Sequence, residues 1–218
     1  TALIDAMRKE EMEVYLFTRP RRFGKTLNLS MLDAYFNEKY AGNVWFDGLR
    51  ISELIPDDPR KNSCTVIFLS MKDLRSETYE GFLERIGMKM GDVYGSFPEL
   101  KDSPKLDDRQ KKSYHDVWMG SASGAALESS LCNLAKMLTI EHERKVVLLI
   151  DEYDNAVNEA ESDELRKRIL GFMSNFLSSA LKDNSSLDFA VVTGVMQIAK
   201  ASIFSGLNNL YVNSVFDS

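Results

Sequence analysis

The chain has 218 residues, 44% of them hydrophobic and 28% charged, which suits one domain with a sizeable core and is short for two. Its formal net charge of −6 argues against a broad, non-specific grip on nucleic acid, which needs a basic face. The longest apolar runs are far too short to cross a bilayer, and no signal peptide is visible, so no membrane association is expected.

The cysteine content favours a reducing compartment. Cys64 and Cys132 lie in apolar or amphipathic segments and are predicted to be buried, reduced thiols. No zinc-ligand spacing is present, and His115 and His142 have no cysteine nearby. We therefore expect a cytoplasmic protein. Because the chain begins at Thr1 without a methionine and stops just after a strand-like segment, we expect it to be a fragment of a longer protein.

Strand-like and helix-like segments alternate along the chain. The strand-like segments are continuous apolar runs, which is typical of a parallel sheet covered by helices on both faces. The predicted strands are residues 14–18, 64–71, 188–195 and 210–215, and a further strand lies in the run KVVLLIDEYD, residues 145–154. The predicted helices are residues 1–11, a segment beginning at Lys25 with Leu29, Leu32 and Phe36 on one side, residues 76–90, a segment over 127–138, residues 162–182, and a short helix before the last strand.

Residues 92–124 carry no clear periodicity. Proline, glycine, serine and charged residues dominate this segment, so we interpret it as an insertion or a loop within a single domain that spans residues 1–218.

The run RPRRFGKT, residues 19–26, lies between the first strand and the second helix, where a phosphate-binding loop works. Gly24 would let the backbone approach phosphates closely, Lys25 would reach the β- and γ-phosphates, and the Thr26 hydroxyl would ligate magnesium. The usual first glycine of the pattern is replaced by Arg19, so a basic surface turn is the alternative interpretation. The predicted nucleotide contacts are Arg22, Phe23, Gly24, Lys25, Thr26 and Leu27.

The run VVLLIDEYD provides the second signal, because five apolar residues lead into Asp151 and Glu152 at the carboxyl end of a strand. Asp151 is suited to hold magnesium together with Thr26, and Glu152 is suited to polarise an attacking water as a general base. For Asp154, we favour a helix-capping role over a role in orienting a neighbour or a metal-bound water.

The run DFAVVTGV ends in Thr193 and Gly194. Thr193 is a candidate to touch the γ-phosphate or the attacking water; the alternative is a strand-end threonine that satisfies the backbone. We assign Lys25, Glu152 and Thr193 as the catalytic residues. Further along, helix capping is the favoured role for Ser205, Asn208 and Asn209.

The segments FTRPRRFGKTLNLSML, GALESSL, VVLLIDEYDNAV, LKDN and TGVMQIAKASIFSGLNNL closely resemble the AAA-ATPase-like family of mostly bacterial proteins. The resemblance covers nearly the whole chain. It implies a P-loop NTPase three-layer sandwich, with helices on both faces of a parallel sheet of strand order 5-1-4-3-2. Family members share the altered first-glycine position, and they often carry a PD-(D/E)xK nuclease-like domain after this one. One departure is Gln197, where relatives tend to have an arginine.

These features together predict an ATPase that binds ATP with Mg²⁺ and drives or gates an attached effector domain. A nucleotide-binding switch with negligible turnover is the main alternative, and a small-molecule kinase is a weaker one. Arg21 and Arg22 are candidates for an arginine finger, although a solvated basic turn is slightly favoured for them. No guanine-reading motif is obvious, so ATP is the default nucleotide. Nucleic acid is not an expected partner of this domain alone, and a homo-oligomer stays open.

Overall fold

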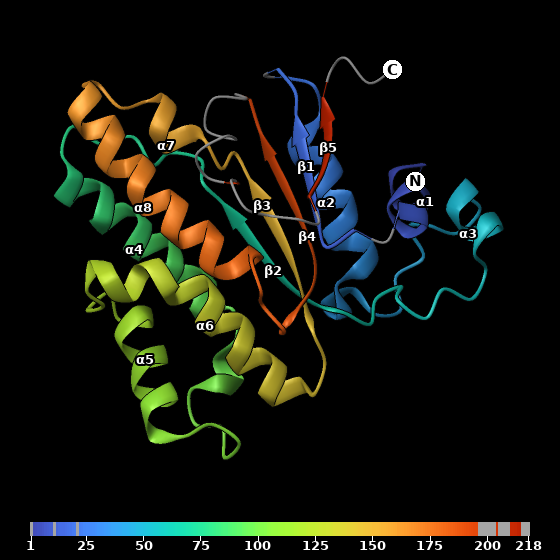
Figure 1. The fold of residues 1–218 in the computed structure, drawn as a ribbon. Helices are drawn as coiled ribbons and strands as arrows, with labels where there is room; N and C mark the ends of the chain where they lie inside the picture. The colour runs from blue at the N-terminus through green and yellow to red at the C-terminus, as the bar shows by residue number, and fades with distance from the viewer. Residues whose placement is uncertain (1, 11, 21, 196–203, 205–209, 215–218) are drawn as a thin grey trace.

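The structure is a computed structural model that describes residues 2–10, 12–20, 22–195, 204 and 210–214. Five strands form one sheet in the order β2-β3-β4-β1-β5, and every neighbouring pair is parallel (Figure 1). This confirms the predicted order, which reads the same sheet from its other edge. The strands are β1 (Val14–Thr18), β2 (Thr65–Ser70), β3 (Val146–Asp151), β4 (Leu187–Gly194) and β5 (Leu210–Ser214).

Helices cover both faces of the sheet (Figure 1). On one face lie α4 (Tyr79–Gly95), α6 (Gly124–His142) and α8 (Asp163–Leu181), with α5 (Asp108–Trp118) packed outside α4 and α6. On the other face lie α1 (Ala2–Glu10), α2 (Lys25–Phe36) and the short α3 (Arg50–Leu54). The remaining short helices are η1 (Glu38–Tyr40), η2 (Pro98–Leu100) and α7 (Asn155–Asn158). Among the described residues, no helix combines the length and apolar character that crossing a bilayer requires.

Alternation along the strands divides the core between the two faces. Successive side chains of a strand point to opposite faces, so Val14 and Leu16 pack with α4, α6 and α8, whereas Tyr15 packs with α1 and α2. Every residue of β3 is buried, which places this strand at the centre of the hydrophobic core. The carboxyl end of β3 is therefore held by packing on both sides of the sheet.

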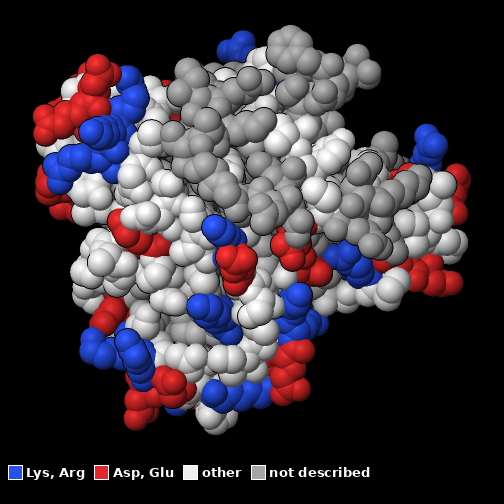
Figure 2. Space-filling view, in the orientation of Figure 1, with Lys and Arg blue, Asp and Glu red and all other residues white. Residues whose placement is uncertain are grey.

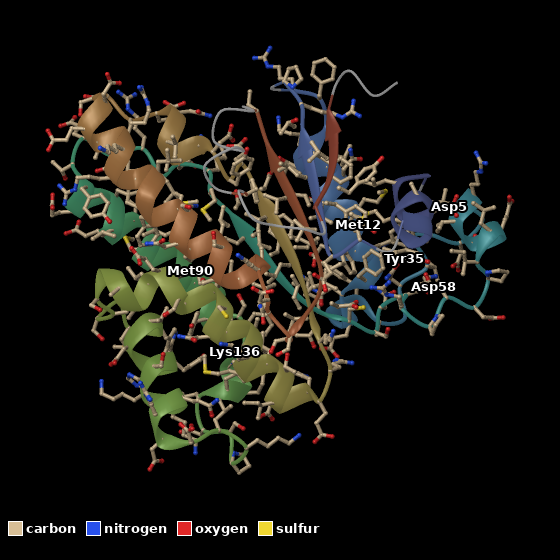
Figure 3. All side chains as sticks on the ribbon, in the orientation of Figure 1. Asp5, Met12, Tyr35, Asp58, Met90 and Lys136 are labelled. Atoms are coloured by element: carbon tan, nitrogen blue, oxygen red, sulfur yellow. The ribbon has the colours of Figure 1, made fainter. Side chains whose placement is uncertain are left out.

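The end of α2 is tied to the loop that leads into β2. The Tyr35 hydroxyl donates to Asp58 Oδ2 at 2.7 Å, and both side chains are buried and lie close together in Figure 3. The predicted inward residues Leu29, Leu32 and Phe36 are buried as well. These contacts fix α2 against the sheet, and with it the loop that precedes this helix.

Our interpretation of residues 92–124 as a loop is wrong. The helix α4 continues to Gly95, and α5 occupies Asp108–Trp118. The Tyr114 hydroxyl donates to the carbonyls of Tyr94 and Phe97 at 3.0 and 3.2 Å, so α5 is packed onto α4 through buried tyrosines. The charged and polar residues that suggested a loop form the exposed face of an amphipathic helix, which presents few apolar residues to the core.

Candidate functional site

The loop between β1 and α2 ends in a glycine that caps the helix. Gly24 adopts a left-handed conformation (φ 71°, ψ 17°) at the N-cap of α2, which a residue without Cβ adopts at no steric cost. As a glycine, the N-cap residue has no side chain to accept from the first-turn N–H groups. The first-turn N–H groups and the positive end of the helix dipole are thus presented at the loop, as an anion site requires.

Lys25 bends back across the loop. It is only 8% exposed, and its Nζ donates to the carbonyl oxygens of Arg19 and Pro20 at 2.8 and 2.9 Å. The backbone N–H of Arg19 donates in turn to the carbonyl of Gly194 at 3.1 Å. The loop is therefore anchored at its start to the end of β4, with the lysine ammonium held inside it. Phe23 and Leu27 are exposed, at 57% and 72%.

Three side chains distant in sequence meet at the carboxyl edge of the sheet. Asp151 is 2% exposed, and its Oδ2 accepts a hydrogen bond from Thr26 Oγ1 at 2.6 Å. Its Oδ1 accepts from the hydroxyl of Thr193. Because β3, β4 and β1 are neighbours in the sheet, the phosphate-loop threonine and the acidic strand end fall on either side of the end of β4. The structure thus brings these three predicted residues together.

Thr193 makes a contact that neither sequence-based interpretation anticipated. Its hydroxyl bonds a carboxylate rather than the backbone, and it does so in the buried interior, since Thr193 is 2% exposed. Together, the two threonine hydroxyls fix both oxygens of Asp151. The carboxylate is thereby held in one orientation before any ligand arrives.

Glu152 turns the chain sharply after β3. Its φ of 54° lies in the left-handed region, which non-glycine residues adopt uncommonly, and Asn155 N–H donates to its carbonyl at 2.9 Å. The side chain is half-buried, and no hydrogen bond or ion pair joins its carboxylate to the described residues. The chain therefore turns directly after Asp151, and the Glu152 carboxylate has no partner among the described residues.

The favoured capping role of Asp154 is wrong. The residue stands at the N-cap of α7 but makes no side-chain capping bond. Its buried Oδ2 instead accepts from the backbone N–H of Val195 and from Asn158 Nδ2, both at 2.9 Å. The single-turn helix α7 offers little to cap, whereas the backbone N–H of Val195, just beyond β4, takes the buried carboxylate as its acceptor. Asp154 therefore joins the acidic loop to the end of β4.

Gly194 completes this junction and was missed as a site residue. A Cβ on Gly194 would lie 2.3 Å from Tyr153 Cε1 and 2.8 Å from Asp154 Oδ1, so no larger residue fits without displacement. The backbone N–H of Tyr153 also donates to the carbonyl of Thr193 at 3.0 Å. Burial, and secondarily the nearby Asp154, raises the pKa of Tyr153, so its ring stays a neutral part of the packing.

Several predicted features lie outside the described residues: Arg21, Gln197, Ser205, Asn208, Asn209 and the short helix before the last strand. Within the described chain, no group of three or more His, Cys, Asp or Glu side chains is arranged to hold a metal ion. A site built from Thr26, Asp151, waters and phosphate oxygens needs no such group, because Mg²⁺ keeps several waters and takes few protein ligands.

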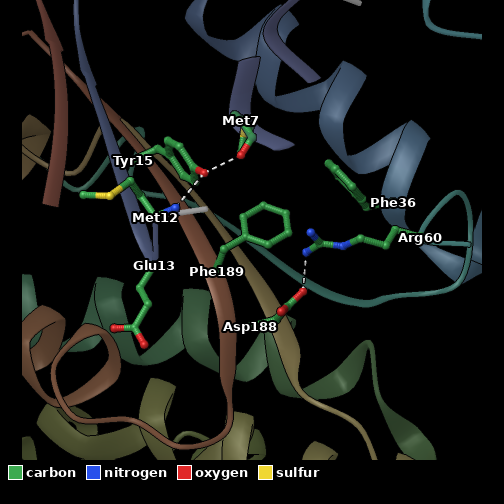
Figure 4. A pocket seen from close by; sticks show the side chains of 8 residues that line it. All are labelled: Met7, Met12, Glu13, Tyr15, Phe36, Arg60, Asp188 and Phe189. Atoms are coloured by element: carbon green, nitrogen blue, oxygen red, sulfur yellow. Dashed lines mark hydrogen bonds and ion pairs between the residues drawn. The ribbon is translucent and has the colours of Figure 1, made fainter. Parts of the chain in front are cut away.

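Away from the phosphate loop, a cavity of about 300 Å³ lies at the amino edge of the sheet, where the strands begin (Figure 4). It is walled by Tyr15, Phe36 and Phe189, and the Arg60 guanidinium lies 5.0 Å from the Phe189 ring and 5.6 Å from the Phe36 ring. Arg60 also forms an ion pair with Asp188. The charged groups there are paired with each other and with aromatic faces, in contrast to the phosphate-loop edge.

Comparison with known proteins shows the family of this chain. The family model described as predicted AAA-ATPase matches residues 1–204. This chain belongs to that family. The resemblance expected from the motifs is thereby confirmed. The domain is also similar to an uncharacterized protein in the vnfD 5' region of Azotobacter chroococcum mcd 1, with 26% identity over 198 residues. That match covers 90% of this chain and 33% of the relative, so the chain spans about a third of the relative's length.

Proposed function

We propose that this AAA-ATPase-like domain adopts a P-loop NTPase fold, binds ATP together with Mg²⁺, and hydrolyses it. The observation that carries the proposal is the convergence of Thr26 and Thr193 on the two oxygens of a buried Asp151, beside a lysine-bearing loop at a helix N-terminus. A strand–loop–helix anion site next to a buried carboxylate is the arrangement that phosphoryl transfer uses.

The phosphate loop would supply charge neutralisation. Lys25 would exchange the carbonyls of Arg19 and Pro20 for the β- and γ-phosphate oxygens, and the first-turn N–H groups of α2 would bind the phosphate chain. Preorganised donors of this kind stabilise charge that develops on the transferred phosphoryl group.

The donor set suits magnesium. The hydroxyl of Thr26 and the carboxylate of Asp151 are hard oxygen donors within 2.6 Å of each other, and both are held in place by their surroundings. Thr26 directly, and Asp151 directly or through water, would hold Mg²⁺, which would neutralise the phosphate oxygens when bound. Thr193 would act through Asp151, by fixing the carboxylate orientation.

Glu152 is the proposed general base. Its carboxylate would accept a proton from the attacking water as the water oxygen bonds to the γ-phosphorus and the bond to the leaving ADP oxygen breaks. The left-handed turn at Glu152 supports this role, because the residue directly follows Asp151 at the end of β3 and its side chain is only half-buried.

The broader setting is a proposal at the level of the whole protein. We propose that ATP drives or gates an attached effector domain, for which a PD-(D/E)xK nuclease-like domain is the candidate, and that the protein works in the cytoplasm, with self-assembly left open. Basic and acidic side chains are interspersed on the face in Figure 2, which supports a domain that does not bind nucleic acid by itself.

The runner-up is a nucleotide-binding switch with negligible turnover, and contacts at the end of β4 support keeping it. Gly194 bonds the start of the phosphate loop, and Val195 bonds Asp154, so bound nucleotide could bias the chain beyond residue 195 without hydrolysis. A small-molecule kinase is a third candidate, which would transfer phosphate to an acceptor other than water.

Phosphate release with ATP and Mg²⁺ tests these proposals. The Glu152→Gln variant should bind ATP as the wild type does, while its hydrolysis falls by about 100-fold or more. If the wild type binds ATP and Mg²⁺ yet releases no phosphate, the switch replaces the ATPase. Equal turnover in the variant and the wild type would instead remove Glu152 from the chemistry.

A further inference from the structure

The strand β2 forms one edge of the sheet, because β3 is its only neighbour among the described strands. Just before β2 begins, its outer side is covered by the segment after α2. The N–H of Cys64 donates to the carbonyl of Phe36 at 2.9 Å, and the carbonyl of Cys64 accepts from the N–H of Glu38 at 3.0 Å. The chain turns into η1 at Glu38, so this pairing does not continue along β2.

Three residues of β2 point their backbone groups away from the sheet. The N–H of Met71 donates toward β3, to the carbonyl of Asp151 at 2.9 Å, and the backbone groups of a strand alternate between its two sides. The outward groups therefore belong to Val66, Phe68 and Ser70. None of the described residues forms a hydrogen bond with these outward N–H and C=O groups. The sequence TVIFLS also lacks the proline or charged side chain that commonly protects an edge strand from pairing.

A cavity of about 240 Å³ lies beside the first half of β2. Its walls combine apolar side chains with carboxylates: Val66, Phe68, Val93, Phe97, Glu38 and Glu99. A lysine has an apolar stem and a cationic end, and such side chains bury the stem while the charge meets a polar group. The cavity therefore suits a lysine side chain that enters from outside the domain.

One of the carboxylates in the cavity is available to a cation. Glu38 is paired with Arg144, and the lysine that lines the cavity, Lys39, is paired with Asp33. The only hydrogen-bond or ion-pair partner of Glu99 among the described residues is the ring of His142, at 3.3 Å. Glu99 is also exposed, so a cation can reach it without breaking an existing ion pair.

A matching cation lies just beyond the other end of β2. Lys72 is exposed, and no carboxylate of the described residues pairs with it. The two ends of the strand thus carry opposite charges, with Glu99 near the start of β2 and Lys72 after its end. Two copies of the strand placed antiparallel would bring each lysine to the glutamate of the other copy.

We propose that β2 pairs antiparallel with β2 of a second copy of this chain, about a twofold axis at Phe68, to form one continuous sheet. In this register Val66 lies opposite the partner's Ser70, and each outward pair exchanges two hydrogen bonds. The register is centred on the uncovered residues, since Cys64 is already bonded and the strand ends at Ser70. Lys72 then lies opposite the partner's Cys64, where the cavity opens. The interface is self-complementary, as a twofold dimer requires, and it does not depend on nucleotide.

Sedimentation velocity over a series of protein concentrations tests the backbone pairing. The wild-type chain should form a dimer. Ser70→Pro removes an outward N–H and leaves the bonds of β2 to β3 in place, since proline is accommodated at such edge positions. The dissociation constant of the dimer should then rise about tenfold or more. Ser70→Ala is the matched control, because it keeps the N–H and should dimerise as the wild type does. Circular dichroism checks that both variants are folded.

Charge reversal tests the pairing of the two strand ends. Lys72→Glu and Glu99→Lys should each raise the dissociation constant about tenfold, because each places like charges together at both ends of the interface. An equimolar mixture of the two variants should regain the wild-type value, since every contact in a mixed dimer joins a lysine to a glutamate. The control reversals Lys167→Glu and Glu164→Lys alter exposed residues of α8 and should have no effect.

Three results would overturn the proposal. The wild-type chain remains a monomer across the series, or Ser70→Pro is folded and dimerises as tightly as the wild type, or the mixture of charge variants associates no more tightly than either variant alone. The charge variants leave the backbone unchanged, so they decide the question if the proline variant does not fold.

Discussion

The two edges of the sheet carry charged groups in different states. At the amino edge, Arg60 is paired with Asp188 and lies against two phenylalanine rings, so its charge is matched by the protein. At the carboxyl edge, the Lys25 ammonium has only carbonyl partners among the described residues, and Asp151 is held by two hydroxyls. Ion pairing contributes to the fold at the first edge, whereas the charged groups at the second edge have neutral partners among the described residues, as the proposed nucleotide site requires.

This difference shows how charged groups that stabilise the fold can be distinguished from charged groups suited to bind a ligand. A charged group whose partner has the opposite charge and a fixed geometry contributes mainly to stability. Other buried charges of opposite sign hydrogen-bond to neutral groups and do not pair with each other. Such charges are suited to bind one ionic ligand between them. Substitution of the charged residue at the amino edge should therefore lower stability and leave nucleotide binding intact. Substitution of the lysine at the carboxyl edge should weaken nucleotide binding and change stability little.

The largest expected effect comes from Lys25→Met. The change keeps the apolar stem but removes the charged donors to phosphate, so ATP affinity should fall about 100-fold, equivalent to about 3 kcal/mol. The melting temperature should change little, because only bonds to two carbonyls are lost. Calorimetric titration and a thermal scan measure the two quantities. A large loss of stability with intact ATP binding would reverse the comparison of the two edges.

Next in size is Gly194→Ala, which tests the junction at the end of β4. The added methyl group would overlap Tyr153 and Asp154, and overpacking of this kind costs about 1–3 kcal/mol in the free energy of unfolding. Urea denaturation measures this cost. Gly171→Ala is the control, because nothing lies within 4 Å of its added Cβ. If both alanine variants are equally stable, the junction is looser than the contacts indicate.

A smaller effect is expected from Arg60→Met at the amino edge. The variant loses a half-exposed ion pair and two cation–π contacts, which together should cost about 1 kcal/mol in the free energy of unfolding. ATP affinity should stay within twofold of the wild type, because the residue is far along the sheet from the phosphate loop. A marked loss of ATP binding in this variant would show that the two edges are coupled.

A last effect, similar in size, sharpens the description of the carboxyl edge. Thr193→Val keeps the shape of the side chain but removes the hydrogen bond to Asp151, so the Mg²⁺ concentration required for half-maximal ATPase activity should rise about fivefold, equivalent to about 1 kcal/mol. Thr193→Ser should restore the wild-type requirement. If serine does not rescue the Mg²⁺ dependence, the role of Thr193 is packing rather than positioning of the carboxylate.

Much of the fold could be predicted from the sequence because local patterns determined it. Continuous apolar runs predicted all five strands, four of them to within one residue and β3 inside residues 145–154, and the family resemblance supplied their order. The segment that holds α5 could not be predicted, because its few inward residues, such as Tyr114, acquire meaning only when Tyr94 is packed against them.

The site was predictable in part for the same reason. Gly24, Lys25, Thr26 and Asp151 belong to short motifs, and they could be named from sequence alone. The bonds that Thr193 and Asp154 form join segments 41 or 42 residues apart in sequence, and no local pattern specifies them. Only the neighbouring positions of β3 and β4 in the sheet bring these groups within reach.

The folded-back Lys25 has a consequence for how a nucleotide would associate. The carbonyls of Arg19 and Pro20 act as internal competitors for the ammonium, so phosphate gains only the difference between the new bonds and those two. Measured affinity would then understate the strength of the lysine–phosphate contact. The association rate constant would include the movement of the Lys25 side chain out of the loop. A rate constant below the diffusion limit would then reflect the time that this rearrangement takes.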